Sequence, residues 1–303
     1  MRALVTGANG FVGIHLVDHL RACGDEVIES AVDITDRSRL AEAIAEQRPE
    51  VIYHLAAQAD VGGSWASPIP TLRVNIEGTV NVLDAAVAAG VQRVLAVTSA
   101  DIYGPVGEDE LPLTEDQPIR PVSPYGASKA SADIMCLAAG LAHGIEVVRA
   151  RSFNHLGPGQ NDKFVASAIA SRIVRNERNG ESTVRVGNLE ARRDFTDVRD
   201  VVRAYRLLMT EGEAGEVYHV CSGIDRAVRE LAEALVAMAG SAMELKADPD
   251  LFRPVDLKVM RGDYAKIKAA TGWSPEIDIQ TTLRDLLEYW RAHPEGVTKP
   301  EIA

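Results

Sequence analysis

Short apolar runs alternate along the first half of the chain with segments in which apolar residues recur every three or four positions. The short runs are typical of buried strands, and the longer segments are typical of amphipathic helices. Strands and helices in this rhythm form β-α-β units of a parallel sheet. The pattern predicts strands at residues 3–5, 26–29, 51–55, 93–97 and 146–149, and a return to the sheet at residues 217–220.

Glycines mark the ends of the helices expected between these strands. Gly24, Gly90 and Gly144 each stand shortly before a predicted strand, where a left-handed residue commonly ends a helix. Residues 71–89 and 125–142 form two predicted helices that are apolar on more than one face. Such helices indicate that another subunit covers part of their surface.

The rhythm changes after about Gly157, where a stretch rich in glycine, asparagine and arginine is followed by a helix and a basic segment. The fold class we expect is α/β: a doubly wound parallel sheet of the Rossmann type with a smaller C-terminal substrate-binding lobe. The expected division assigns residues 1–156 and 195–223 to the sheet domain and residues 157–194 and 224–303 to the smaller lobe.

Three glycines follow the first predicted strand directly and lead into the first predicted helix. Their spacing, Gly-x-x-Gly-x-x-Gly, departs from the Gly-x-Gly-x-x-Gly of the usual dehydrogenase fingerprint. Glycines allow positive φ and close approach of the backbone, so a pyrophosphate can lie against the helix N-terminus. The residues expected to hold a dinucleotide here are Gly7, Asn9, Gly10, Phe11, Val12 and Gly13.

The identity of the dinucleotide depends on the end of the second predicted strand. Glu29 lies there, where a carboxylate can accept hydrogen bonds from ribose hydroxyls and repel a 2′-phosphate. Asp33 is a second candidate, better placed for the adenine side, while Arg37 and Arg39 could fold back onto a phosphate. NAD(H) and NADP(H) both stay open as cofactors, and NAD is favoured.

Composition and charge narrow the class of protein. The 303 residues are 46% hydrophobic, which is enough for a substantial core, and the formal net charge of -12 excludes nucleic acid and anionic membranes as expected partners. Three scattered cysteines, no cleavable signal pattern and no apolar run of membrane-spanning length indicate a cytoplasmic enzyme. The sequence contains no zinc-type motif, so no metal site is predicted. An anionic substrate would need arginines or helix N-termini gathered at its site.

A tyrosine and a lysine provide candidate acid/base chemistry. Tyr125 and Lys129 stand four residues apart in a predicted helix and therefore share one face. A nearby positive charge favours the phenolate form and brings the tyrosine closer to useful proton transfer. The pair follows the exit of the fourth predicted strand at Ser99, and open α/β sheets place their chemistry at the carboxyl ends of strands.

The glycine loop, the Ser99 segment and the Tyr125–Lys129 pair resemble the extended short-chain dehydrogenases/reductases over nearly the whole chain. The resemblance implies that Ser99 hydrogen-bonds the substrate oxygen, Tyr125 exchanges its proton, and Lys129 holds the nicotinamide ribose and tunes Tyr125. It also implies cofactor contacts from five further residues, which are Asp33, Ile34, Leu55, Ala56 and Ala57.

Residues 151–160, with Phe164 and Val165, resemble the nucleotide-sugar enzymes of this family, and in particular those that reduce GDP-4-keto-6-deoxy-D-mannose. Arginines in the second lobe supply the local positive charge that such a substrate requires. Arg193 and Arg253 are the candidates for binding the diphosphate, whereas Arg192 is expected to be a solvated surface residue. The expected substrate contacts are Asp101, Asn154, His155, Val165, Arg193 and Arg253.

The resemblance leaves the reaction open between reduction and dehydration. Dehydratases of the family carry a glutamate two residues after the catalytic serine or threonine, where this chain has Asp101. That difference favours an NAD(P)-dependent oxidoreductase that reduces a 4-keto group and yields GDP-D-rhamnose. GDP-mannose 4,6-dehydratase and a 4-epimerase stay as alternatives. A sensor without turnover is disfavoured because Ser99, Tyr125 and Lys129 are all present. In the family, the helices at 71–89 and 125–142 pair across a homodimer.

Overall fold

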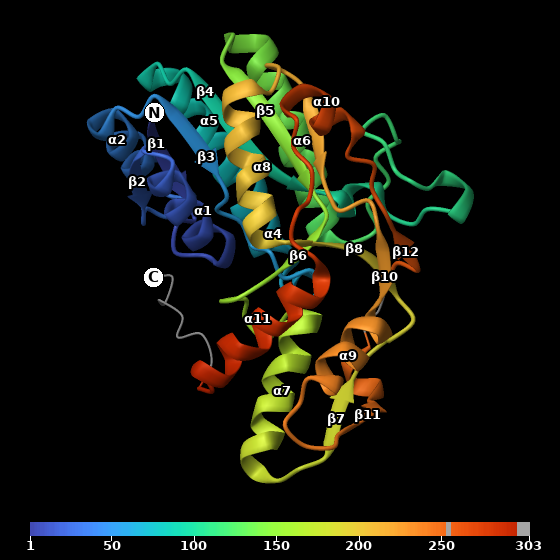
Figure 1. Cartoon of the computed structure of the whole chain (residues 1–303). Coiled ribbons are helices and arrows are strands. Elements are labelled where there is room, and N and C mark those ends of the chain that lie inside the picture. Colours follow the sequence, from blue (N-terminus) through green and yellow to red (C-terminus); the bar gives the residue numbers. More distant parts are fainter. Residues whose placement is uncertain (253–255, 296–303) are drawn as a thin grey trace.

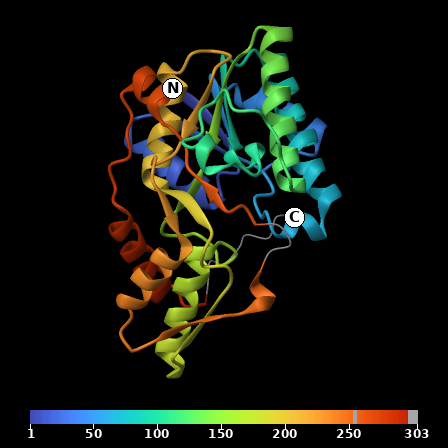
Figure 2. The ribbon, with the colours of Figure 1, turned by 90° about the vertical axis from the view of Figure 1, so that its right-hand side faces the viewer.

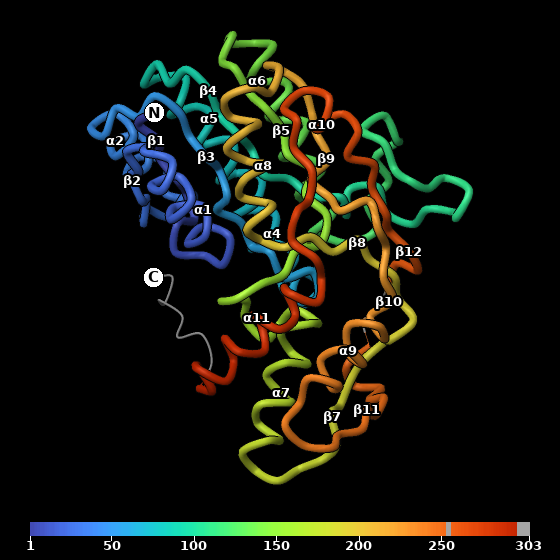
Figure 3. Tube along the Cα trace, viewed as in Figure 1, coloured from blue at the N-terminus to red at the C-terminus, as the bar shows by residue number. Residues whose placement is uncertain are grey.

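Six parallel strands form the main sheet of the computed structural model, which describes residues 1–252 and 256–295 (Figure 1). The strands are β1 (Arg2–Thr6), β2 (Glu26–Ser30), β3 (Val51–His54), β4 (Arg93–Ser99), β5 (Glu146–Ser152) and β9 (Val217–Val220). They lie in the order β2, β1, β3, β4, β5, β9, which confirms the parallel sheet and all six predicted strands. The chain trace in Figure 3 shows the late return of β9 to the edge beside β5.

Helices cover both faces of this sheet because alternate side chains of each strand enter two different apolar cores. Ala3 and Val5 of β1 belong to one core and Leu4 belongs to the other. The helices of the first face are α1 (Phe11–Ala22) and α8 (Val198–Glu211), joined by α10 (Ala265–Thr271), and those of the second face are α2 (Arg37–Gln47), α5 (Gly78–Ala89) and α6 (Pro124–His143). The sheet is therefore doubly wound, as predicted.

The helix ends agree with the glycine pattern. Gly24, Gly90 and Gly144 have φ values of 82°, 70° and 71°, which confirms the predicted left-handed ends. The predicted helix at 71–89 contains a π-helical turn at Arg73–Glu77, between α4 (Pro68–Leu72) and α5. A single turn of this kind is frequent near functional sites.

A second lobe lies beneath the carboxyl ends of the sheet strands (Figure 2). Its apolar core joins three helices, α7 (Val165–Asn179), α9 (Val228–Ala237) and α11 (Ile279–Ala292). Its strands are β6 (Asn154–Leu156), β7 (Thr183–Val186), β8 (Arg192–Asp197), β10 (Asp225–Ala227), β11 (Glu244–Ala247) and β12 (Val259–Met260). Strand β8 pairs with β6, β10 and β12, and β7 pairs with β11.

The strand order reverses between β1 and β3, because β2 lies on one side of β1 and β3 on the other. Open α/β sheets bind ligands in the crevice outside the carboxyl ends of the strands at such a point. Within residues 1–252 and 256–295, no helix is long and apolar enough to cross a membrane. The domain boundaries at residues 156, 194 and 223 stay predictions.

Candidate active site

The glycine loop brings the end of β1 against the end of β3. Gly7 has a φ of 71°, and a Cβ atom there would lie 2.8 Å from the backbone nitrogen of Ala56. A Cβ at Gly13 would overlap the carbonyl oxygens of Gly7 and Ala8. Neither position accepts a side chain, so these two glycines allow α1 and β3 to approach β1 closely.

This loop fits a bound dinucleotide. Helix α1 begins after Gly10, and no side chain caps its first amide groups. Uncapped amides and the positive end of the helix dipole are suited to a pyrophosphate. Leu55 and Ala56, after β3, lie beside the glycine loop and extend the floor of this binding surface. The backbone nitrogen of Leu55 donates to the backbone oxygen of Thr6, and that of Ala56 donates to the Thr6 hydroxyl, both at 3.3 Å. The residues that would hold the cofactor along this floor are Gly7, Asn9, Gly10, Phe11, Val12, Gly13, Leu55, Ala56 and Ala57.

The three residues predicted to contact the adenosine of the cofactor have different surroundings in the structure. The Glu29 carboxylate pairs with Arg21, in the last turn of α1, at 2.7 Å. Asp33 accepts hydrogen bonds from Thr35 and shapes its own turn. The Ile34 side chain is 4% exposed and packs toward the second apolar core. The predicted cofactor contacts of Glu29, Asp33 and Ile34 stay predictions. The carboxylates of Glu29 and Asp33 are exposed.

Ser99 and Tyr125 come together at the carboxyl end of β4. Ser123 caps α6 by accepting a hydrogen bond from Gly126 at 3.0 Å, which starts the helix immediately before Tyr125. Ser99 and Tyr125 are 9% and 8% exposed. Burial raises the pKa of the Tyr125 phenol, the nearby charge of Asp101 raises it further, and a hydrogen bond with Ser99 opposes both effects. The phenol therefore keeps its proton at neutral pH.

Lys129 lies one helical turn after Tyr125 and is 7% exposed. Its Nζ donates to the backbone oxygen of Val97 at 2.9 Å. Burial lowers the pKa of Lys129 to about 8. The groups that shift the pKa of Tyr125 include Asp101 but not Lys129, so the lowering of the tyrosine pKa expected from the sequence is not what this arrangement produces.

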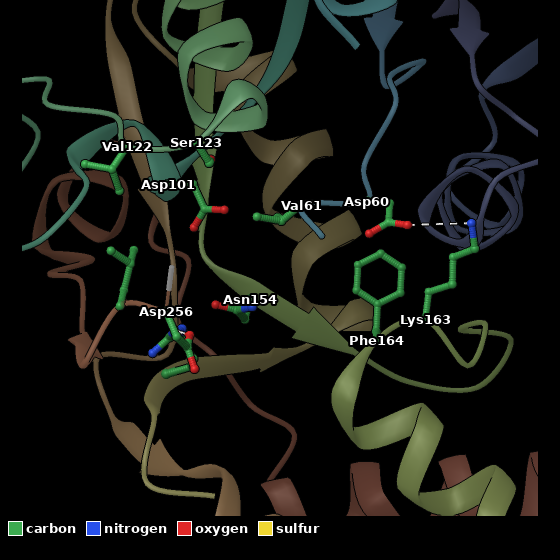
Figure 4. A pocket seen from close by; sticks show the side chains of 11 residues that line it. Asp60, Val61, Asp101, Val122, Ser123, Asn154, Lys163, Phe164 and Asp256 are labelled. Carbon is green, nitrogen blue, oxygen red and sulfur yellow. Dashed lines mark hydrogen bonds and ion pairs between the residues drawn. The ribbon is translucent and has the colours of Figure 1, made fainter. Parts of the chain in front are cut away.

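A cavity of about 80 Å³ opens beside this group (Figure 4). Figure 4 shows Asp101 and Asn154 directed into it and the ion pair of Asp60 with Lys163, which spans 3.6 Å, at one side. Asp60 precedes α3 (Gly63–Ala66) in the Rossmann lobe, and Lys163 precedes α7, so the cavity lies between the lobes. Its lining comprises Asp60, Val61, Asp101, Val122, Ser123, Asn154, Lys163, Phe164, Arg193, Asp256 and Leu257.

A larger cavity of about 290 Å³ continues into the second lobe. Asn154, Lys163, Arg193 and Asp256 line both cavities and therefore mark their junction. The further lining is mostly apolar and includes the predicted contact Val165. It comprises Asp162, Val165, Ala168, Ile169, Arg172, Val186, Gly187, Asn188, Ala191, Phe195, Val228 and Leu251.

The neighbouring arginines of β8 have different surroundings. Arg193 pairs with Asp256 at 2.7 Å at the junction of the cavities, and its side chain is 11% exposed. Arg192 instead pairs with Asp225 and is 46% exposed. Neighbouring strand residues face opposite sides, so only one of the two reaches the site. Arg253, the other predicted diphosphate contact, lies outside the described residues.

His155 is the predicted substrate contact that the structure brings into neither cavity. Its ring stacks on Phe11 of the glycine loop, with centroids 6.2 Å apart and an interplanar angle of 16°. Its Nδ1 is 3.0 Å from the Phe153 oxygen, and burial lowers its pKa. His155 therefore joins the second lobe to the first residue of α1, beside the cofactor loop.

Among the described residues, sequence reasoning missed five charged residues that line the cavities: Asp60, Asp162, Lys163, Arg172 and Asp256. One signal could have revealed Arg172. It shares a helix face with Val165, Ala168 and Ile169, at the i, i+3, i+4 and i+7 spacing, and is the one charged position of that face. Asp60 and Asp256 reach the site from loops, and no local pattern predicts which exposed carboxylates face a cavity.

Comparison with known proteins identifies the family of the chain. Residues 29–286 match the protein family described as GDP-mannose 4,6 dehydratase. The chain belongs to this family of extended short-chain dehydrogenases/reductases. The chain is similar to GDP-6-deoxy-D-mannose reductase of Pseudomonas aeruginosa, with 38% identity over 96% of this chain and 97% of that protein.

Two solved structures extend the similarity to three dimensions. The structure described as RMD from Pseudomonas aeruginosa complexed with NADPH has a TM-score of 0.89 and 38% identity, and the match covers 97% of this chain and 100% of that one. UDP-glucose 4-epimerase of Thermus thermophilus, in complex with NAD, has a TM-score of 0.88 and 31% identity, over 96% and 99% of the two chains. The chain is thus an NAD(P)-dependent nucleotide-sugar oxidoreductase.

Proposed function

We propose that this protein reduces the 4-keto group of GDP-4-keto-6-deoxy-D-mannose to give GDP-D-rhamnose. The observation that carries the proposal is Asp101, which lines the smaller cavity beside Tyr125 in place of a dehydratase glutamate. Its carboxylate is one methylene shorter than glutamate and reaches less far toward carbons 5 and 6. The 38% identity to a GDP-6-deoxy-D-mannose reductase over 96% of the chain supports the same reaction.

The protein's own residues act on the keto oxygen. The raised pKa of Tyr125 keeps the phenol protonated, which is the form needed to give a proton to that oxygen. The hydroxyl of Ser99 donates a hydrogen bond to the same oxygen and holds it near Tyr125. When bound, the reduced nicotinamide supplies the hydride that carbon 4 receives. The ketone gains one hydride and one proton and becomes an alcohol.

Lys129 supports this step through its charge beside the bound cofactor, since its ammonium does not shift the pKa of Tyr125 in this arrangement. The carbonyl of Val97 orients the Nζ of Lys129 at 2.9 Å. A pKa of about 8 leaves the lysine mostly charged at neutral pH. Its position after one helical turn also suits a contact with the nicotinamide ribose, as the family resemblance implies.

The proposed cofactor is NAD(H) or NADP(H). Glu29, near the end of β2, favours NAD(H) because its carboxylate can accept hydrogen bonds from ribose hydroxyls and repel a 2′-phosphate. The similar structure at 38% identity contains NADPH, which favours NADP(H). The similar epimerase structure at 31% identity contains NAD, which favours NAD(H). A test of the reaction therefore requires both NADH and NADPH.

We also propose a homodimer that pairs helices of the Rossmann lobe. Ile134, Leu137 and Leu141 follow one another at helix spacing on α6 and are 53%, 36% and 81% exposed. Ile69 on the neighbouring α4 is 70% exposed. Contiguous exposed apolar side chains on packed helices are typical of a subunit interface.

Dehydration of GDP-mannose is the second candidate, because the matching family is described by that activity. It would need a group that removes the proton at carbon 5 and assists the loss of water at carbon 6. Asp101 is the carboxylate nearest in sequence to Ser99 that lines the smaller cavity. A 4-epimerase or another nucleotide-sugar dehydratase of the family is a third.

Product analysis separates these reactions. The enzyme is incubated with GDP-4-keto-6-deoxymannose or with GDP-mannose, each with NADH and with NADPH, and products are identified by mass and nuclear magnetic resonance. Reduction of the keto sugar with matching oxidation of the nicotinamide supports the proposal. Loss of water from GDP-mannose without net oxidation makes the protein a dehydratase, and inertness toward both sugars overturns the GDP assignment of the substrate.

A further inference from the structure

The larger cavity has two ends with different chemistry. At the end shared with the smaller cavity lie Asn154, Lys163, Arg193 and Asp256. The far end is lined mainly by apolar side chains, among them Ile169, Val186 and Leu251. In an extended ligand that enters from the smaller cavity, charged groups would lie at the junction and a flat apolar group would lie at the far end.

Arg172 is the one cation that lines the larger cavity without also lining the smaller one, among the residues the structure describes. It is half-buried, and it lies seven residues after Val165 on α7, or roughly 10 Å along the helix. That distance separates Arg172 from Val165, the first residue of α7 after the loop that carries Lys163.

The Arg172 guanidinium has hydrogen-bond donors to spare. Its Nη1 donates to the backbone oxygen of Arg185 at 3.0 Å. No carboxylate within residues 1–252 and 256–295 forms an ion pair with it, in contrast to Arg193. Burial lowers the pKa of Arg172, the charge of Arg175 lowers it further, and the nearby charges of Asp162 and Asp248 oppose these effects. A half-buried cation with open donors beside an apolar surface is suited to a ligand that presents acceptors at the edge of an apolar ring.

We propose that Arg172 binds the O6/N7 edge of a guanine base and so selects guanosine diphosphate sugars over their uridine and adenosine counterparts. This inference rests on the proposed function, because it places the nucleotide of that substrate in the larger cavity. Guanine presents two adjacent acceptors to an arginine fork, adenine presents a donor beside N7, and uracil presents a donor beside O4. Ile169, Val186 and Leu251 would cover the faces of the ring.

Isothermal titration of the full chain with GDP, UDP and ADP, without keto sugar or nicotinamide, tests the assignment of Arg172. The wild type should bind GDP at least ~10-fold more tightly than UDP or ADP. Arg172→Gln should weaken GDP binding by about 10-fold or more and leave UDP binding within about 2-fold. Arg172→Lys, which keeps the charge and loses the fork, should lower the GDP preference by a smaller factor.

Two further variants serve as controls. Arg175→Gln removes the same charge from an exposed position of the same helix and should leave all three affinities unchanged. Arg193→Gln, at the junction, should weaken GDP and UDP alike.

An equal loss of GDP and UDP in Arg172→Gln would show that Arg172 contacts phosphate or ribose, and a wild type without preference for GDP would also overturn the inference. If Arg172→Gln does not fold, an unchanged preference in Arg172→Lys decides against it. The titration involves no turnover, so it can succeed when reduction of the keto sugar fails, and it can fail when reduction succeeds.

Discussion

The two sides of the site are held in different ways. We call Ser99, Asp101, Tyr125 and Lys129 the catalytic face, and Lys163, Arg172 and Arg193 the cationic face. Ser99, Tyr125 and Lys129 are each less than a tenth exposed and are fixed by hydrogen bonds within the Rossmann lobe. The cationic face lies on the second lobe, and its Lys163 is 51% exposed.

Buried ion pairs beneath the catalytic face add to this contrast. Asp133, two helical turns after Tyr125, is fully buried and pairs with Arg149 at 2.9 Å and with Arg151 at 3.0 Å on β5. These contacts fix α6 against the sheet that carries Ser99. The cationic face has partners that a ligand can replace, such as Asp60 and Asp256. The difference indicates that one lobe fixes the chemistry while the other selects the substrate.

Removal of the proton donor should have the largest effect. Tyr125→Phe keeps the ring and deletes the hydroxyl, so we expect kcat to fall by about 10²–10⁴-fold, the range typical for a general acid. Steady-state kinetics measure kcat, and titration with GDP and with NADPH measures binding, which should stay within about 2-fold. Undiminished turnover would contradict the role of Tyr125.

Removal of the buried ammonium should change how stability depends on pH. Lys129 loses its proton near pH 8 in the folded chain and near pH 10.5, its ordinary value, in the unfolded chain. Between these values the unfolded chain binds more protons, so the free energy of unfolding rises with pH. The rise from this group should total roughly 3 kcal/mol between pH 7 and pH 11.

Urea unfolding of the wild type and of Lys129→Met across that pH range measures the effect. The difference in unfolding free energy between the two proteins should grow with pH in favour of the wild type. A difference that stays constant would mean that burial does not lower the pKa of Lys129.

Loss of charge on the cationic face should affect binding and spare the chemistry. Arg193→Gln removes a charged hydrogen-bond donor at the junction of the cavities, so we expect KM for the nucleotide sugar to rise by about 10- to 50-fold. The expected fall in kcat is below ~3-fold. Arg192→Gln, next to it and paired with Asp225 away from the cavities, is the matched control and should change KM by less than ~2-fold. A loss confined to kcat would remove the distinction between the two faces.

The smallest effect on turnover should come from the subunit interface. Leu141→Glu puts a charge on the exposed apolar stripe of α6, so we expect a monomer by light scattering and kcat within about 3-fold of the wild type. Ile224→Glu, at a 53% exposed position of the second lobe, should leave the oligomeric state unchanged. An unchanged mass for Leu141→Glu would mean that this stripe is not the interface.

Local patterns predicted the Rossmann lobe well because its signals are short-range. The strands predicted at residues 51–55 and 93–97 are buried apolar runs. The helices before β2, β4 and β5 end near glycines with positive φ, which are Gly24, Gly90 and Gly144, whereas α2 ends at Arg48. Tyr125 lies at the start of α6, where Ser123 caps the helix, and that arrangement follows from adjacent residues.

The second lobe was less predictable because its contacts are distant in sequence. Strand β8 pairs with three short strands drawn from residues 154–156, 225–227 and 259–260, which are too short to carry a period of their own. The partner of Glu29 also depends on tertiary packing, since Arg21 reaches it from the last turn of α1. Burial of Tyr125 reversed the expected direction of its pKa, and no sequence pattern measures burial at that position.

Isotope transfer from the cofactor tests whether this protein delivers a hydride to carbon 4 of the keto sugar. The enzyme is given GDP-4-keto-6-deoxymannose with NADH or NADPH carrying deuterium at both hydrogens of nicotinamide carbon 4, and the product is examined by nuclear magnetic resonance. We expect one deuterium at carbon 4 of the sugar, together with a new hydroxyl there. A product without deuterium at carbon 4 would contradict reduction of the keto group by this protein.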